Sequence, residues 1–301
     1  MLYFFLKECN QAVKNTIQNM KIIDITNAIE EIAPLQYAED FDNVGLLIGN
    51  NQTKVSGVLV TLDTLEETVE EAIFKNCNLI VSFHPIIFSG LKKLNGTDYV
   101  ERVVLKAIQN NIAIYATHTA LDNSKTGVSA KICEQLQLKD TKILIPKKGI
   151  IKKLTTSVPR DAAKKVRKAL FDAGAGNIGN YDKASFNVLG EGTFIGNENS
   201  HPFMGEKGKT HSEQEVLISL VFESKYEAAI IKALNTEHPY EEVAFDITTT
   251  DNVHQDVGMG MIGELPNAID ESEFLLRLKS SMQTTSIRHS KFIGKKIQAK
   301  I

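Results

Sequence analysis

The sequence has little cysteine, little net charge and no long apolar run, and each absence excludes a class of protein. Its 301 residues include only three cysteines, without paired spacing. This argues against a disulfide framework or a thiolate zinc site and is compatible with a reducing cytoplasm. The net charge of −3 favours neither nucleic acid nor an anionic membrane. No apolar stretch approaches the roughly 20 residues of a membrane span. We therefore expect a cytoplasmic protein without a membrane or nucleic-acid partner.

Common catalytic motifs are also missing. The sequence contains no Walker-type glycine–lysine loop and no G-x-S-x-G elbow. The segment 258–263 matches G-x-G-x-x-G literally. A dinucleotide fingerprint requires a strand before this motif and a helix after it, but 251–256 is a poor strand and 264–266 does not open a helix. We interpret the segment as a turn.

Alternating strand and helix patterns begin after Met20. Apolar runs of strand length end near residues 49, 62, 81 and 116, and segments with one apolar helical face, such as 66–75 and 99–110, lie between them. The alternation predicts an α/β domain with a mostly parallel, covered sheet over residues 20–148. Residues 1–19 lack the basic segment and the apolar core of a signal peptide, and we interpret them as an appendage.

The pattern changes near Pro146. Residues 149–250 follow the order β-α-β-β-α-β of a ferredoxin-like unit. We expect this module to be inserted into the first domain, with residues 251–301 returning into that domain. Residues 296–301 alternate polar and apolar side chains, as a strand does, with no terminating signal. The expectation is therefore a chain truncated at its C-terminus.

Histidine and aspartate side chains follow two successive predicted strands. His84 comes after the run 79–81, and His118 and Asp122 come after the run 112–116. Ligands of open α/β sheets bind at the carboxyl ends of the strands, and imidazole with carboxylate suits Zn, Mn or non-haem Fe. Each histidine could instead be an ordinary buried residue. A turn is expected between His118 and Asp122, and Asp122 could instead cap the segment that follows it, since Asp122-Asn123-Ser124 is also typical of a turn. Spacing alone leaves both interpretations open.

One further segment carries two interpretations. His238-Pro239-Tyr240-Glu241-Glu242 is polar with one aromatic and lies in the connection before the last strand of the module. Polar connections are ordinary, which favours a capped helix end. The alternative is a contact with a small ligand or another subunit.

Several stretches together resemble the GTP cyclohydrolase I type 2 homologue family, also called Nif-three-like proteins. The resemblance runs from about residue 21 to 301 and rests on AEDFDNVGL (38–46), SFHPIIF (82–88), THTALD (117–122), GAGNIGNY (174–181) and HPYEE (238–242). It implies an α/β domain interrupted by a PII/CutA-like module. It further implies up to two divalent metal ions per subunit and a toroidal homohexamer.

The resemblance also implies a set of metal ligands. His84 matches the second histidine of the family's His-His pair, and Asp122 matches the aspartate of its H-T-x-L-D segment. His118 lies beside them as a ligand or as an orienting group. Phe83 stands where the family usually has the first histidine, and the family's late histidine and glutamate have no counterpart in this sequence. We therefore expect weak binding of at most one ion per chain, and impaired ring assembly.

Two functions remain open. The first is a divalent-metal-dependent hydrolase of unknown substrate, since a metal with an open position activates water. GTP ring opening is implied by the family's name only, because no residue pattern in the sequence indicates recognition of guanine or triphosphate. The second is a non-enzymatic metal-binding hexameric scaffold, or a regulatory protein that senses a small molecule or nucleotide through the PII-like module.

Overall fold

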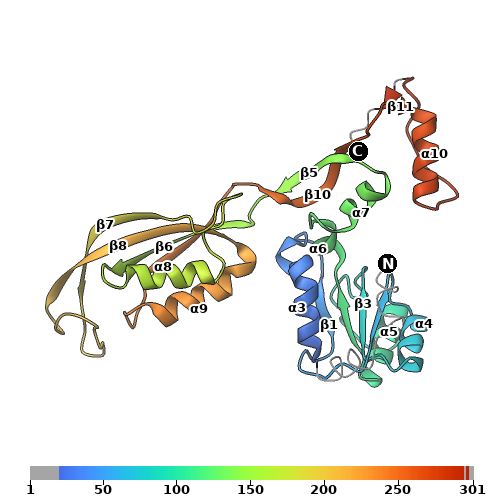
Figure 1. Cartoon of the computed structure of the whole chain (residues 1–301). Coiled ribbons are helices and arrows are strands. Elements are labelled where there is room, and N and C mark those ends of the chain that lie inside the picture. The colour runs from blue at the N-terminus through green and yellow to red at the C-terminus, as the bar shows by residue number, and fades with distance from the viewer. Residues whose placement is uncertain (1–19, 295, 298–301) are drawn as a thin grey trace. The chain divides into compact units, whose positions relative to one another are not determined.

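The computed structural model describes residues 20–294 and 296–297 (Figure 1). The chain divides into two compact units. One comprises the described residues up to Pro146 and from Gln255 onward, and the other is Lys147–His254. The predicted appendage, residues 1–19, and the end of the predicted last strand, 298–301, lie outside the described residues. No described helix has both the length and the apolar character needed to cross a bilayer.

A four-stranded mixed sheet forms the centre of the first unit. Its strands are β1 (Gly45–Ile48), β2 (Val58–Thr61), β3 (Leu79–Ser82) and β4 (Ala113–Ala116), in the spatial order β1-β4-β3-β2. β2, β3 and β4 are parallel, whereas β1 pairs antiparallel with β4. The predicted α/β unit with a mostly parallel sheet is confirmed, with one antiparallel strand at its edge.

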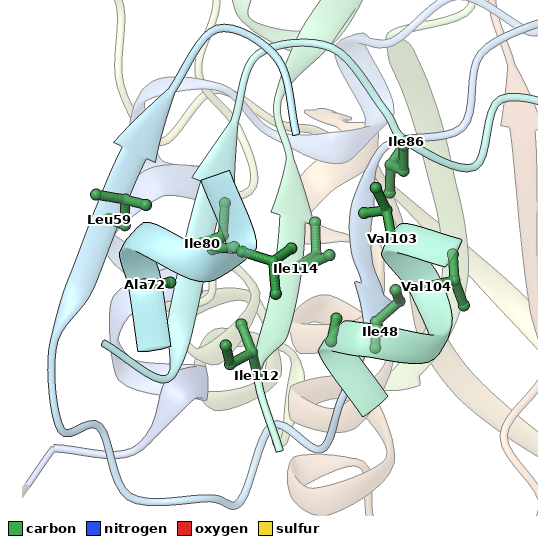
Figure 2. Close-up of a cluster of buried hydrophobic side chains, with 11 residues drawn as sticks. Ile48, Leu59, Ala72, Ile80, Ile86, Val103, Val104, Ile112 and Ile114 are labelled. Atoms are coloured by element: carbon green, nitrogen blue, oxygen red, sulfur yellow. The ribbon is translucent and has the colours of Figure 1, made fainter. Parts of the chain in front are cut away.

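Two helices cover one face of this sheet. They are α4 (Glu66–Phe74) and α5 (Tyr99–Gln109). Figure 2 shows Val103 of α5 facing the same cluster as Ile80 of β3 and Ile114 of β4, and all three side chains are buried. Because side chains of a strand alternate between faces, only every second residue of β3 and β4 joins this cluster.

The other face of the sheet is covered by α3 (Ile22–Ile32). Ile22 packs there among Leu79, Val81 and Tyr115, the alternate residues of β3 and β4. A sheet covered on both faces needs apolar side chains on both, which is why β3 and β4 are buried throughout. The carboxyl ends of these rigid strands position the residues described below.

The remainder of the first unit contains several further helices and strands. They are a 3-10 turn η1 (Leu35–Tyr37), α6 (His118–Asp122), α7 (Val128–Gln135), β5 (Lys139–Lys147), β10 (His254–Glu264), β11 (Ile269–Asp270), α10 (Glu271–Ser281) and β12 (Lys296–Ile297). β5 pairs with β10, and β11 pairs with β12.

The expectation of a turn over residues 258–263 is wrong, because this segment lies within strand β10. A Cβ atom at Gly258 would collide with the carbonyl oxygen of Ile145 on β5, and one at Gly263 would crowd Leu138. The glycines therefore allow two backbones to approach closely in a strand pair, a role that glycine takes in strands as well as in turns.

The second unit has the predicted element order. It consists of β6 (Ile151–Pro159), α8 (Ala163–Asp172), β7 (Phe186–Ile195), β8 (Thr210–Glu223), the 3-10 turn η2 (Ser224–Tyr226), α9 (Glu227–Glu237) and β9 (Phe245–Thr249). The four strands form an antiparallel sheet in the order β7-β8-β6-β9. Figure 1 shows α8 and α9 on one face of this sheet, where their buried side chains join Leu154 and Ile218. This is the arrangement of a ferredoxin-like unit.

Candidate functional site

Each parallel strand of the first sheet is followed, two residues beyond its end, by a polar side chain. Asp63 follows β2, His84 follows β3 and His118 follows β4. Strand β1 runs in the opposite direction, and Gly45 at its start pairs with Ala116 at the end of β4. The segment just before β1, which includes Asp42, therefore reaches the same edge of the sheet.

The imidazole of His118 is oriented by Asp42. His118 Nδ1 lies 2.8 Å from Asp42 Oδ1, and the second carboxylate oxygen accepts hydrogen bonds from the backbone N–H of Thr119, at 3.1 Å, and from its hydroxyl. The Asp42 side chain has no exposed surface. Burial raises the pKa of Asp42, but the hydrogen bonds from His118 and Thr119 outweigh it and hold the pKa below its usual value.

His84 has an equivalent but more exposed partner. Its Nδ1 lies 2.7 Å from Asp63 Oδ1, and the exposed fractions of the two side chains are 47% and 52%. An ionised carboxylate only accepts hydrogen bonds, so the Nδ1 of each paired histidine carries the proton. Nε2 of a neutral ring is then the nitrogen with a free lone pair, which is the arrangement found in metal-bound histidines.

The structure brings the two histidines of the predicted site together at one edge. The ring centroids of His84 and His118 are 5.5 Å apart, and Phe83 packs edge-on against both rings. Burial raises the pKa of Asp122, and the negative charge of Asp42 raises it further. Positive charge on His118 and His84 would lower it, but the net effect is a raised pKa. In the chain, Asp122 ends the short helix α6 that begins at His118.

A short helix, rather than the predicted turn, joins His118 to Asp122. His118 begins α6 with φ of +25°, a left-handed value that residues with a Cβ rarely adopt. Such a conformation costs about 1–3 kcal/mol and persists where its surroundings enforce it. Here the backbone N–H of His118 donates to the Phe83 carbonyl at 2.9 Å, and Asp42 holds the ring. Among the described residues, Asp122 makes no hydrogen bond that would identify it as a cap.

Sequence reasoning missed both carboxylates that orient the histidines. In the sequence, Asp42 belongs to the motif AEDFDNVGL but has no assigned role, and Asp63 belongs to no motif. The signal for Asp63 was its position, because it follows its strand by the same two residues as His84 and His118. No such signal existed for Asp42, since its place depends on the antiparallel direction of β1.

The side chains at this edge are of the chemical types that bind divalent metals. Two imidazoles and one carboxylate form the ligand set of many catalytic zinc sites, and carboxylates behind the imidazoles are the usual supporting groups. Their arrangement is looser than a formed site: across residues 20–294 and 296–297, no three His, Cys, Asp or Glu side chains are grouped so that they could hold an ion.

Comparisons with known proteins identify relatives along nearly the whole chain. The sequence model of the Duf34/NIF3 (NGG1p interacting factor 3) family matches residues 20–299. A GTP cyclohydrolase 1 type 2 homolog of Bacillus subtilis is 37% identical over 265 residues, which cover 88% of this chain and 71% of the relative. A protein of the same name from Listeria innocua is 34% identical over 90% of this chain and 72% of the relative.

Solved structures agree with the sequence comparisons. A Bacillus cereus protein related to NIF3 has a TM-score of 0.74 and 36% identity, covering 92% of this chain and 74% of that protein. A Staphylococcus aureus protein has a TM-score of 0.66 and 29% identity over 92% of this chain and 73% of its own. The resemblance inferred from the motifs is thereby confirmed, and the chain belongs to the Duf34/NIF3 family.

Proposed function

We propose that this protein binds one divalent metal ion at the edge of its first sheet, through His84, His118 and Asp122. The observation that carries the proposal is the pair of carboxylates, Asp63 and Asp42, within 2.8 Å of the Nδ1 atoms of the two histidines. A carboxylate at Nδ1 fixes the tautomer and increases the basicity of Nε2, which is what a ligand nitrogen requires. Imidazole and carboxylate donors suit Zn, Mn or Fe.

A divalent-metal-dependent hydrolase is the activity that this set of residues supports. A bound ion would supply Lewis acidity and activate water. The imidazoles of His84 and His118 would hold the ion, while Asp42 and Asp63 keep the rings oriented. The Asp122 carboxylate, which ends the helix that His118 begins, would complete the ligand set. The relatives' name, GTP cyclohydrolase 1 type 2 homolog, makes a nucleotide the first substrate to test.

Assembly with further copies of the chain is the second part of the proposal. The resemblance implies a homohexamer in which the unit Lys147–His254 is an inserted PII/CutA-like module. Edge strand β7 supports self-association, because Phe186, Leu189 and Ile195 on it are exposed apolar side chains. A ring whose second unit senses a ligand, without catalysis, is the alternative function that the cavity in this unit favours.

Metal analysis after dialysis tests the binding site. The whole chain is equilibrated with Zn or Mn, dialysed, and analysed for metal by mass spectrometry. We expect at most one equivalent per chain, reduced by His84→Ala and by His118→Ala but not by His201→Ala, which changes an exposed histidine of the other unit. Undiminished metal in both site variants would refute the site, and two tightly held ions would refute the stoichiometry.

Turnover tests the hydrolase separately. Nucleotide hydrolysis by the Mn-loaded chain should disappear in Asp122→Ala and persist in Asp40→Ala, which removes an exposed carboxylate of the loop before β1. Turnover that is indifferent to Asp122→Ala would exclude hydrolysis at this site. Bound metal without any turnover would favour the scaffold or regulatory function.

A further inference from the structure

The unit Lys147–His254 contains a cavity of about 350 Å³ that the proposed metal site does not use. Its wall is formed by the end of strand β7, by Glu215 on β8 and by the connection between α9 and β9. Small-molecule sites in proteins have volumes of about 300–1,000 Å³ and combine an apolar lining with a few convergent polar groups. The cavity therefore has the dimensions of a site for a small ligand.

A buried carboxylate without a counter-charge lies in this wall. Glu215 is only 7% exposed, and its Oε1 accepts a hydrogen bond from the hydroxyl of Tyr240 at 2.6 Å. Within the part of the chain that the structure describes, its side chain has no other hydrogen bond and no ion pair. A carboxylate offers about four acceptor positions, and burying it without donors is unfavourable. Glu215 thus retains acceptor capacity at the surface of the cavity.

The neighbouring strand leaves space for this carboxylate. A Cβ atom at Gly192 on β7 would collide with the carboxylate group of Glu215. Any other residue at 192 would occupy the space in which the carboxylate lies. The absence of a side chain at this position is therefore part of how the wall of the cavity accommodates a buried acid.

The segment 238–242 combines a structural histidine with residues that line the cavity. His238 is structural: its buried ring lies with Nε2 2.9 Å from the Ser157 carbonyl oxygen, while its Nδ1 accepts a hydrogen bond from the backbone N–H of Tyr240. Burial lowers the pKa of His238, and both contacts suit a neutral ring. This ring holds the turn that presents Tyr240 to the cavity.

Aromatic and acidic groups make the lining suitable for a cation. Phe194 and Tyr240 both line the cavity, with ring centroids 6.0 Å apart and planes at 62°. The charged lining residues among those described are Glu215, Glu241 and Glu242, and none is a lysine or arginine. Aromatic faces attract cations, and the carboxylates add to this attraction.

We propose that this cavity binds a small organic cation, namely a primary ammonium attached to an apolar group. The ammonium donates to the free acceptor positions of Glu215, and the apolar part lies against Phe194 and Tyr240. A neutral molecule of the same shape lacks the charge that the buried carboxylate requires, and an anion is repelled by it. The site is independent of the metal ligands, so its failure and that of the proposed metal site are separate results.

Binding of benzylammonium to the whole chain tests the proposal, with benzyl alcohol and benzoate as neutral and anionic probes of similar shape. Titration calorimetry or NMR shift mapping should show saturable benzylammonium binding that perturbs Tyr240 and its neighbours. We expect benzyl alcohol to bind at least about tenfold more weakly, which corresponds to about 1.4 kcal/mol, and benzoate not to bind. Equal binding of benzylammonium and benzyl alcohol, or no saturable binding in the millimolar range, would overturn the proposal.

Two variants locate the effect. Glu215→Gln keeps an oxygen that can accept the hydrogen bond from Tyr240 but removes the negative charge. It should weaken the binding of benzylammonium at least about tenfold. Glu206→Gln removes the same charge from an exposed loop position and should leave the affinity unchanged. Equal effects of the two variants would overturn the assignment of Glu215. If Glu215→Gln does not fold, Phe194→Leu is the deciding variant. It should weaken the binding of benzylammonium more than that of benzyl alcohol. An equal loss of affinity for both probes would count against the cation site.

Discussion

The imidazole of His118 is held by the carboxylate of Asp42, which is completely shielded from solvent and 2.8 Å away. The other histidine of the site, His84, is paired with Asp63 at a similar distance, but both side chains are about half exposed. Water competes with an exposed hydrogen bond and screens its charges, whereas a buried one has no substitute. We therefore expect the two carboxylates to contribute unequally to stability and to metal affinity.

Replacing Asp42 should destabilise the first unit. In Asp42→Asn the amide oxygen can still accept one hydrogen bond, but the NH₂ group then faces either the backbone N–H of Thr119, a donor, or His118, which can accept only by moving its proton from Nδ1 to Nε2. Leaving buried polar groups unsatisfied costs about 1–3 kcal/mol, which urea unfolding measures. Asp40→Asn is the control, because Asp40 is exposed in the same loop and should change the free energy of unfolding by less than about 0.5 kcal/mol. Equal effects would contradict the proposed role of Asp42.

Asp42 and Asp63 should also contribute unequally to the affinity for metal. Removing a carboxylate that orients a metal-binding histidine typically weakens metal binding by about 10- to 100-fold. We expect Asp42→Asn to fall in this range and Asp63→Asn to have a smaller effect, because solvent can replace the exposed Asp63. Competition with a chromogenic chelator measures both affinities. A larger loss in Asp63→Asn than in Asp42→Asn would show that burial does not decide the ranking.

The second unit should lose stability in acid through Glu223. Burial raises the pKa of Glu223, but hydrogen bonds and charges from His254 and Lys225 outweigh it and lower the pKa from 4.5 to about 2. A carboxyl with a depressed pKa in the folded state stabilises the protein above pH 4.5, and this contribution is lost as the pH falls from 4.5 to about 2. The shift corresponds to about 3 kcal/mol.

Urea unfolding at a series of pH values measures this loss. Glu223→Gln should be less stable than the unmodified chain at pH 7, and the difference should shrink as the solution is acidified below pH 4.5. Glu198→Gln, at an exposed loop position, should follow the unmodified chain throughout. A difference between Glu223→Gln and the unmodified chain that stays constant in acid would show that packing, rather than charge, explains the effect.

The core between the first sheet and its helices should be sensitive to truncation. Ile114 has no exposed surface and lies in the cluster of Figure 2, so Ile114→Ala leaves a cavity and should cost about 2–5 kcal/mol. Ile108→Ala removes the same atoms from a side chain that is 50% exposed on α5 and should cost much less. Urea unfolding compares the two, and similar losses would contradict the assigned core.

Local sequence patterns predicted the parts of the fold that depend on local physics. The apolar runs of β3 and β4 and the helical stripe of α5 were recognised because burial imposes a period of two or 3.6 on the residues themselves. The edge that carries His84 and His118 followed from these runs, since parallel strands end together. Strand β10 was not predicted, because its glycines are explained only by their close approach to β5.

The sequence by itself determined the family, the alternation of strands and helices, and which edge of the first sheet carries histidine and aspartate. The tertiary structure decided which carboxylate orients which histidine: Asp42 is 76 residues from His118, and Asp63 is 21 residues from His84. It also decided that Glu215 is buried beside Tyr240, 25 residues away. The physical reason is that hydrogen bonds between distant residues depend on the direction and order of the strands, which no local pattern records.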